Sequence, residues 1–252
     1  MGNILEIENF TQQYNDLSVA VDNISLSVAE GEIFGFIGHN GAGKSTTIKS
    51  VVGILPVRKG AIRIMGQSVS EHLRDCQRQC AYVPDNPELY GYMTGMGYIS
   101  FIADIYGVPE DVRAERIRRY GEAFEILPQL GSLISTYSHG MRQKTALIAA
   151  LVHQPKLLVL DEPFVGLDPK ATATLKGIMR ELCAGGSAVF FSTHVLDVAE
   201  RLCDRVGMLD HGRLIVEGRI AELTAGCTLE ELFLRKLSER KNPADGEKNA
   251  DA

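Results

Sequence analysis

The sequence predicts an α/β protein with a mainly parallel sheet, a flanking antiparallel β layer and an inserted helical subdomain. Near the N-terminus, residues 4–8 and 20–28 alternate apolar and polar side chains, which is typical of strands with one buried face. From residue 156 onward, strand-like apolar runs alternate with helical segments, and such alternation indicates a parallel sheet covered by helices. Between these parts, residues 86–150 show helical spacing and contain no strand candidate.

Short runs bounded by turn residues give the expected strands. The run at 32–37 is apolar and aromatic, which is typical of a strand that is buried on both faces. Pro84 stops another short run, and His211-Gly212 joins two alternating runs in the pattern of a hairpin. In chain order, the expected strands are residues 4–8, 20–28, 32–37, 60–66, 81–83, 156–160, 187–192, 206–210 and 213–217.

Helical spacing, and the change near residue 86 from strand-like to helical patterns, divide the chain further. The expected helices are residues 46–53, 68–80, 98–106, 110–127, 141–152, 170–183 and 196–203. We expect one domain over residues 4–237, in which 4–85 and 156–225 form the core with its β layer and 86–155 form the helical subdomain. The polar, charged residues 238–252 are expected to be a disordered tail.

Composition narrows the classes of function. The chain has 252 residues, enough for one large or two small domains, and its net charge of −6 lacks the basic footprint of a nucleic-acid-binding protein. No apolar run reaches the about 18 residues of a spanning helix, and no signal-peptide pattern opens the chain, so we expect a soluble, cytosolic protein. The five scattered cysteines suit reduced thiols. Cys76 and Cys80 have helical spacing but lack the second ligand pair of a zinc site.

The most specific motif lies between the strand at 32–37 and the helix at 46–53, and it fits the phosphate-loop pattern G-x-x-x-x-G-K-[ST]. Its glycines let backbone N–H groups point inward, and the helix N-terminus adds partial positive charge. In such a loop Lys44 reaches the β- and γ-phosphates and the Ser45 hydroxyl can ligate Mg²⁺. A plain glycine-rich turn is the alternative. The expected nucleotide-binding residues are Gly38, His39, Asn40, Gly41, Ala42, Gly43, Lys44, Ser45 and Thr46.

Two acids, Asp161 and Glu162, follow the apolar strand at 156–160. Active sites of open parallel sheets lie at the carboxyl ends of the strands. There, Asp161 can hold Mg²⁺ through its water shell, and Glu162 can polarise an attacking water. The alternative is a pair of surface acids before the turn at Pro163.

These two motifs are followed below by three more, and all five stand in the order found in the ATP-binding cassette (ABC) family. The chain resembles that family over residues 5–237. Residues 137–143 resemble the signature motif, Gly166-Leu167-Asp168 the D-loop, and Ser192-Thr193-His194 the strand end that carries the switch histidine. Tyr14 stands thirty residues before Lys44, where the family places an aromatic that stacks on adenine. The resemblance implies a P-loop NTPase core.

The resemblance also implies roles for these residues. Glu162 would be the general base or water-orienting acid, His194 the γ-phosphate sensor and Lys44 the charge stabiliser. The Mg²⁺ ligands would be Ser45, Asp85 and Asp161. The signature residues would act in trans, on the ATP of a second subunit, and they are Ser138, His139, Gly140 and Met141. Independently of the family, Ser138 is a natural helix cap, and Gly140 lets a phosphate approach the helix start.

Two positions depart from the family pattern. His139 stands where glycine is usual, but Ser138 and Gly140 are kept, so we expect the signature to function. Asp85 stands where glutamine is usual. Its carboxylate keeps an oxygen for Mg²⁺ but adds negative charge beside the γ-phosphate, which leaves the coordination of the metal open.

The resemblance favours the ATPase subunit of a membrane exporter, working as a homodimer or as a heterodimer with a second ABC subunit. It would hydrolyse ATP with Mg²⁺, drive a separate transmembrane permease, and sit at the cytoplasmic face of the cell membrane. The glycine- and tyrosine-rich turn at 90–97 lies where the family receives the permease. A soluble ABC ATPase acting on nucleic acid or ribosomes, or a regulator without turnover, are the alternatives; the acidic charge argues against a nucleic-acid partner.

Overall fold

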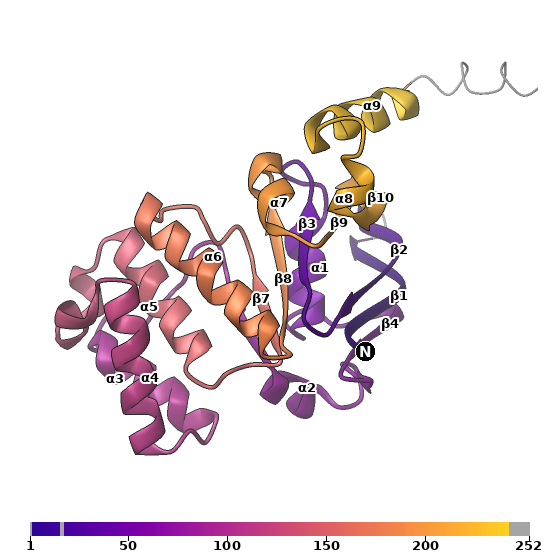
Figure 1. Ribbon diagram of the computed structural model, residues 1–252. Helices are drawn as coiled ribbons and strands as arrows, with labels where there is room; N and C mark the ends of the chain where they lie inside the picture. The colour runs from indigo at the N-terminus through magenta and orange to yellow at the C-terminus, as the bar shows by residue number, and fades with distance from the viewer. Residues whose placement is uncertain (1, 16–17, 242–252) are drawn as a thin grey trace, which may run out of the picture.

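The computed structural model describes residues 2–15 and 18–241, whose strands form two sheets (Figure 1). The first sheet is antiparallel, in the spatial order β2 (Ser18–Ala29), β1 (Asn3–Asn15), β4 (Lys59–Ile64) and β5 (Gln67–Ser68). The second is parallel except for its first pair, in the spatial order β10 (Arg213–Arg219), β9 (Arg205–Asp210), β3 (Ile33–Ile37), β8 (Ala188–Thr193), β7 (Leu157–Leu160) and β6 (Cys80–Val83).

Helices surround the second sheet. In chain order they are α1 (Lys44–Val51), α2 (Leu73–Gln79), α3 (Gly95–Ile105), α4 (Glu110–Ala123), α5 (His139–Leu151), α6 (Pro169–Ala184), α7 (Leu196–Leu202), α8 (Ile220–Leu223) and α9 (Leu229–Lys241). Two 3₁₀ segments, Leu127–Gly131 and Ile134–Thr136, connect α4 to α5. Figure 1 shows α3, α4 and α5 grouped at one side of the molecule, and the first sheet at the opposite side.

The alternation of side chains along the central strands produces two hydrophobic cores. In β3, Ile33 and Ile37 face the core beneath the helices, whereas Phe34 and Phe36 face the core shared with the antiparallel sheet and α1. Phe190 of β8 joins the second core, with its ring centroid 5.4 Å from that of Phe36. Because successive strand residues point to opposite faces, one apolar strand supplies both layers.

The predicted fold class is confirmed, and the hairpin at His211-Gly212 joins β9 to β10 as expected. Several expected boundaries are wrong, among them the first strand, which covers Asn3–Asn15 rather than 4–8. Three other corrections concern helices. The helix expected over 68–80 covers only α2, because Gln67 and Ser68 pair with β4 as a strand. The helix expected to reach residue 127 ends at Ala123, and Glu125 adopts a φ of 54°, which breaks the helical path.

The third correction concerns the tail. α9 continues to Lys241, so the first residues of the expected disordered segment are helical. Residues 242–252 lie outside the described residues. Among the residues that the structure describes, no helix is long and apolar enough to cross a membrane.

Candidate nucleotide site

The phosphate loop joins β3 to α1, and its path depends on glycine. Gly41 and Gly43 have φ values of 82° and 109°, in the left-handed region that side chains rarely adopt. A Cβ on Gly38 would lie 2.5 Å from the carbonyl oxygen of Leu209 at the end of β9. The Gly212 N–H of the β9–β10 turn donates to the Ala42 carbonyl over 2.9 Å. The loop is therefore held tightly against this turn.

Lys44 begins α1, and only 5% of its side chain is exposed. Its Nζ donates to the carbonyl oxygens of Gly38, over 2.6 Å, and His39, over 3.3 Å, both within the loop. Nζ also lies 3.3 Å from Oε1 of Glu162. The ammonium is thus fixed on the inner side of the loop, where backbone N–H groups and a helix N-terminus favour a phosphate.

Asp161 and Glu162 follow β7, and Ser192 of the neighbouring strand β8 ties them together. The Ser192 hydroxyl donates to Oδ1 of Asp161 and accepts the Glu162 N–H over 3.0 Å. Ser192 is fully buried and Asp161 is 3% exposed. Glu162 has a φ of 46°, a strained conformation for a non-glycine residue that costs about 1–3 kcal/mol and is common at active sites.

Glu162 also contacts His194, which follows β8. Nδ1 of His194 lies 3.0 Å from Oε2 of Glu162, and the imidazole is 48% exposed. Since Oε1 faces Lys44, the two oxygens of one carboxylate face an ammonium and an imidazole. A carboxylate held this way, beside a phosphate-binding loop, is placed to accept a proton from water.

The residues proposed for Mg²⁺ offer oxygen ligands, which this ion prefers. The Asp161 carboxylate is buried and, among the described residues, makes no ion pair within 4 Å, so a cation beside it would offset its burial cost. Ser45 is exposed at the start of α1. Asp85 is exposed just after β6, the strand that neighbours β7. Burial, and then the charges of Asp161 and Asp85, raise the pKa of Tyr82, which places both acids near this phenol.

Tyr14 of β1 lies beside the phosphate loop. Its hydroxyl is 3.0 Å from Oγ1 of Thr46, while the residue is 59% exposed. The exposed ring therefore has a face free to stack on a flat base.

The signature segment packs against the D-loop of the same chain. Ser138 caps α5 by accepting the Met141 N–H over 3.3 Å, as its sequence position predicts. The His139 ring covers Gly166, where a Cβ would lie 2.3 Å from the imidazole. Gly140 lies against the Gly166 carbonyl. A Cβ added to Gly140 would lie 2.9 Å from that carbonyl oxygen. Among the described residues, no hydrogen bond or ion pair joins this segment to the phosphate loop.

Asp168 anchors the D-loop to two helices. It caps α6 by accepting the Ala171 N–H over 2.8 Å, and it accepts from Lys144 of α5 over 2.8 Å. The hydrogen bond from Lys144 is the largest cause, and that from Ala171 the next, of a pKa of Asp168 lowered to about 2. Leu167 packs on the core beneath the helices.

Sequence reasoning missed the part played by Ser192, which it treated only as the start of a motif. The signal that could have found it is a polar residue directly after the apolar run 188–191 of a buried strand. It also missed Asp210, at the end of β9, which faces His39 of the phosphate loop at 3.1 Å.

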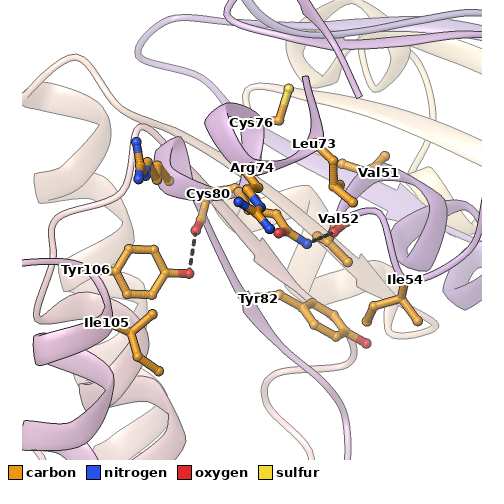
Figure 2. A pocket seen from close by; sticks show the side chains of 12 residues that line it. Val51, Val52, Ile54, Leu73, Arg74, Cys76, Cys80, Tyr82, Ile105 and Tyr106 are labelled. Atoms are coloured by element: carbon orange, nitrogen blue, oxygen red, sulfur yellow. Dashed lines mark hydrogen bonds between the residues drawn. The ribbon is translucent and has the colours of Figure 1, made fainter. Parts of the chain in front are cut away.

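A cavity of about 500 Å³ lies away from the phosphate loop, between α1, α2, β6 and the end of α3 (Figure 2). Figure 2 shows Ile54, Tyr82 and Ile105 around it, and the hydroxyl of Tyr106 bonded to the Cys80 carbonyl over 3.4 Å. Cys76 also lines it, and no second pair of ligands accompanies the two thiols among the lining residues. Burial raises the pKa of Cys80 to about 12, as expected for a structural thiol.

Comparison with known proteins places this geometry in context. The sequence profile of the ABC transporter family matches residues 21–165. The ABC-type transporter ATP-binding protein EcsA of Bacillus subtilis (strain 168) is 33% identical over 241 residues, which are 94% of this chain and 97% of EcsA. The Nod factor export ATP-binding protein I of Sinorhizobium fredii (strain NBRC 101917 / NGR234) is 33% identical over 91% of this chain and 67% of its own length.

The fold has close counterparts among solved structures. The structure of an ATP-binding subunit of an ABC transporter superposes with a TM-score of 0.89 at 34% identity. The match covers 93% of this chain and 99% of the other.

Proposed function

This chain belongs to the ABC transporter family as an ATP-binding subunit, an ATPase that powers a membrane permease, and we propose that it drives export. The observation that carries the proposed chemistry is the position of Glu162. Its carboxylate oxygens lie 3.3 Å from Nζ of Lys44 and 3.0 Å from Nδ1 of His194. Lys44 then binds the β- and γ-phosphates, Glu162 orients the attacking water and accepts its proton, and His194 contacts the γ-phosphate.

Mg²⁺ is the proposed metal, held by Ser45 and Asp161 with Asp85 nearby. When bound, it neutralises charge that develops on the β- and γ-phosphate oxygens. The protein's own contribution is to keep the Asp161 carboxylate in place through the Ser192 hydroxyl. Tyr14 stacks on the adenine, with its hydroxyl beside Thr46.

The signature segment is proposed to act in trans, in a dimer of two ABC subunits. The N-terminus of α5 carries partial positive charge, and Gly140 leaves room for a phosphate to approach it. Because no bond joins this segment to the phosphate loop among the described residues, a second ABC subunit, identical or not, is the proposed source of its phosphate. Gly166 and Asp168 lie beside it and would meet the same partner.

Export, rather than import, is favoured by the short helical insert and by the relative named for Nod factor export. The proposed permease surface is the aromatic turn before and within α3. Tyr92 is 79% exposed, and its ring centroid lies 5.8 Å from that of Tyr90. Phe101 and Ile105 continue this exposed apolar strip toward the cavity of Figure 2. Docking there would hold the protein at the cytoplasmic face of the membrane.

Co-purification from solubilised membranes tests this function. The chain, expressed with its genomic neighbours, should retain a protein with several apolar spans. Tyr92→Ala should weaken that association and leave basal ATP turnover unchanged, whereas the control Leu234→Ala, at an exposed position on α9, should affect neither. Retention of ribosomes or nucleic acid in place of a membrane protein would contradict the transport role.

A mixing experiment tests the dimer. Lys44→Ala and Gly140→Asp chains should each be inactive alone, yet regain part of the parent turnover when mixed, since a heterodimer contains one intact composite site. Absence of any recovery, with mixed dimers confirmed by crosslinking, would contradict action in trans.

A further inference from the structure

A cluster of two histidines and a buried aspartate joins the β9–β10 turn to the phosphate loop, which contributes His39. Nε2 of His39 lies 3.1 Å, and Nε2 of His211 3.8 Å, from the same oxygen, Oδ1 of Asp210. One ligand atom from each of the three residues lies within 4.8 Å of the other two. The chemistry proposed for ATP hydrolysis uses neither Asp210 nor His211.

Both ring nitrogens of His39 face oxygen acceptors. Its Nδ1 lies 2.7 Å from the Asn40 carbonyl, and its Nε2 faces the Asp210 carboxylate. Both oxygens can only accept hydrogen bonds, whereas a neutral imidazole has one donor and one acceptor nitrogen. With Nδ1–H donated to Asn40, the lone pair of Nε2 points at a carboxylate oxygen. A protonated ring satisfies both acceptors by donating from both nitrogens, and a metal ion between Nε2 and Oδ1 satisfies them with the ring neutral. A backbone carbonyl on the other ring nitrogen is the usual orienting partner of a metal-binding histidine.

Asp210 is arranged as a ligand with one free oxygen. Its side chain is 9% exposed, and Arg240 of α9 donates to Oδ2 over 2.9 Å. That contact fixes the carboxylate and leaves Oδ1 directed at the two imidazoles. A hydrogen-bonded carboxylate of this kind resembles the outer-shell support of known metal sites.

We propose that His39, Asp210 and His211 bind a divalent transition-metal ion of the zinc class. Ligand bonds of about 2.0–2.2 Å put two tetrahedral ligand atoms about 3.3 Å apart, close to the 3.1 Å of the first pair. His211 is 79% exposed and can close the remaining gap by rotating its side chain. Imidazole ligands favour zinc over Mg²⁺, so the site is chemically distinct from the proposed Mg²⁺ ligands Ser45 and Asp161. A bound ion would fasten the phosphate loop to the β9–β10 turn.

Cobalt binding to the full chain, purified without a polyhistidine tag or nucleotide, tests the proposal. Co²⁺ should bind at one ion per chain with visible absorption, and Zn²⁺ should displace it in the presence of excess Mg²⁺. His211→Asn should weaken Co²⁺ affinity by at least about tenfold, the scale of losing one metal-site interaction. Asparagine tolerates the φ of 44° at this position, so the turn should keep its shape.

His72→Asn, the same change at an exposed histidine at the start of α2, is the matched control and should bind Co²⁺ like the parent. Equal ATP turnover with Mg²⁺ and equal thermal midpoints without Co²⁺ would show that both variants are folded. Parent-like Co²⁺ affinity in His211→Asn would overturn the proposal, as would absence of binding by the parent. A near-ultraviolet thiolate band would instead assign the ion to cysteine and overturn it too.

Discussion

The Lys44 ammonium lies 3.3 Å from Oε1 of Glu162, across the space between the phosphate loop and the end of β7. The two side chains are 5% and 15% exposed, so solvent screens their attraction weakly. A γ-phosphate bound by Lys44 would lie next to the Glu162 carboxylate. The pair therefore places the charge proposed to bind the substrate beside the group proposed to activate water.

Ser192→Ala should lower both stability and turnover. The substitution removes the hydroxyl shared by the Asp161 carboxylate and the Glu162 N–H, leaving two buried groups without this partner. We expect a loss of about 1–3 kcal/mol in the free energy of unfolding and a fall in kcat of at least about tenfold. Urea unfolding and steady-state ATPase assays measure the two effects.

Ser187→Ala is the control for this prediction. Ser187 is also buried and donates to the Pro155 carbonyl over 2.9 Å, but it precedes β8 at the end remote from the site. Its loss should reduce stability without reducing kcat. If both variants lost activity equally, the effect of Ser192 would be general destabilisation rather than positioning of the acids.

His153 should make the protein less stable in mild acid. Burial lowers its pKa to about 4, and the imidazole stacks on Tyr106 with centroids 3.6 Å apart. The unfolded chain binds this proton near pH 6.5 and the folded chain only near pH 4, so stability falls as pH drops through that window. The contribution is about 2 kcal/mol between pH 8 and pH 5.

His153→Phe should remove this part of the pH dependence while keeping an aromatic ring on Tyr106. The measurement is urea unfolding of parent and variant at pH 8 and pH 5, compared as a difference so that other titrating groups cancel. If the free energy of unfolding changed equally with pH in parent and variant, His153 would not be desolvated as it is in this structure.

Asp85→Asn should raise the Mg²⁺ concentration needed for half-maximal ATPase activity, if Asp85 helps to hold the metal. Affinity for metal-free ATP should stay level or improve, because a negative charge near the phosphates is removed. Titrating Mg²⁺ at fixed ATP measures the first effect and calorimetry with a chelator the second. Identical Mg²⁺ dependence in variant and parent would leave Asp85 as a turn residue after β6.

Local sequence pattern predicted the central strands and the phosphate loop well. Phe34 and Phe36 alternate with Ile33 and Ile37, and such a run has few options other than a buried strand. The loop was predicted because its backbone requires glycine at Gly43, where φ is 109°. Both features depend on residues that are adjacent in the chain, so the sequence alone shows them.

Relationships between distant segments could not be predicted. The bond between Ser192 and Asp161 depends on β8 lying beside β7 with Phe191 opposite Leu160, which is a property of sheet order. The contact of His39 with Asp210 spans the chain and follows from β9 lying next to β3. The predicted end of the helix at 110–127 was also wrong, because Glu125 adopts a φ of 54° that its residue type does not show.

One variant, Glu162→Gln, tests whether Glu162 is the general base. In Glu162→Gln, ATP affinity by calorimetry should stay within about threefold of the parent, while turnover falls by roughly a hundredfold or more, the scale of losing a general base. Glu181→Gln, an exposed change on α6, should match the parent in both. Parent-like turnover in Glu162→Gln, measured on the same samples, would show that Glu162 is not the general base and that another residue accepts the proton.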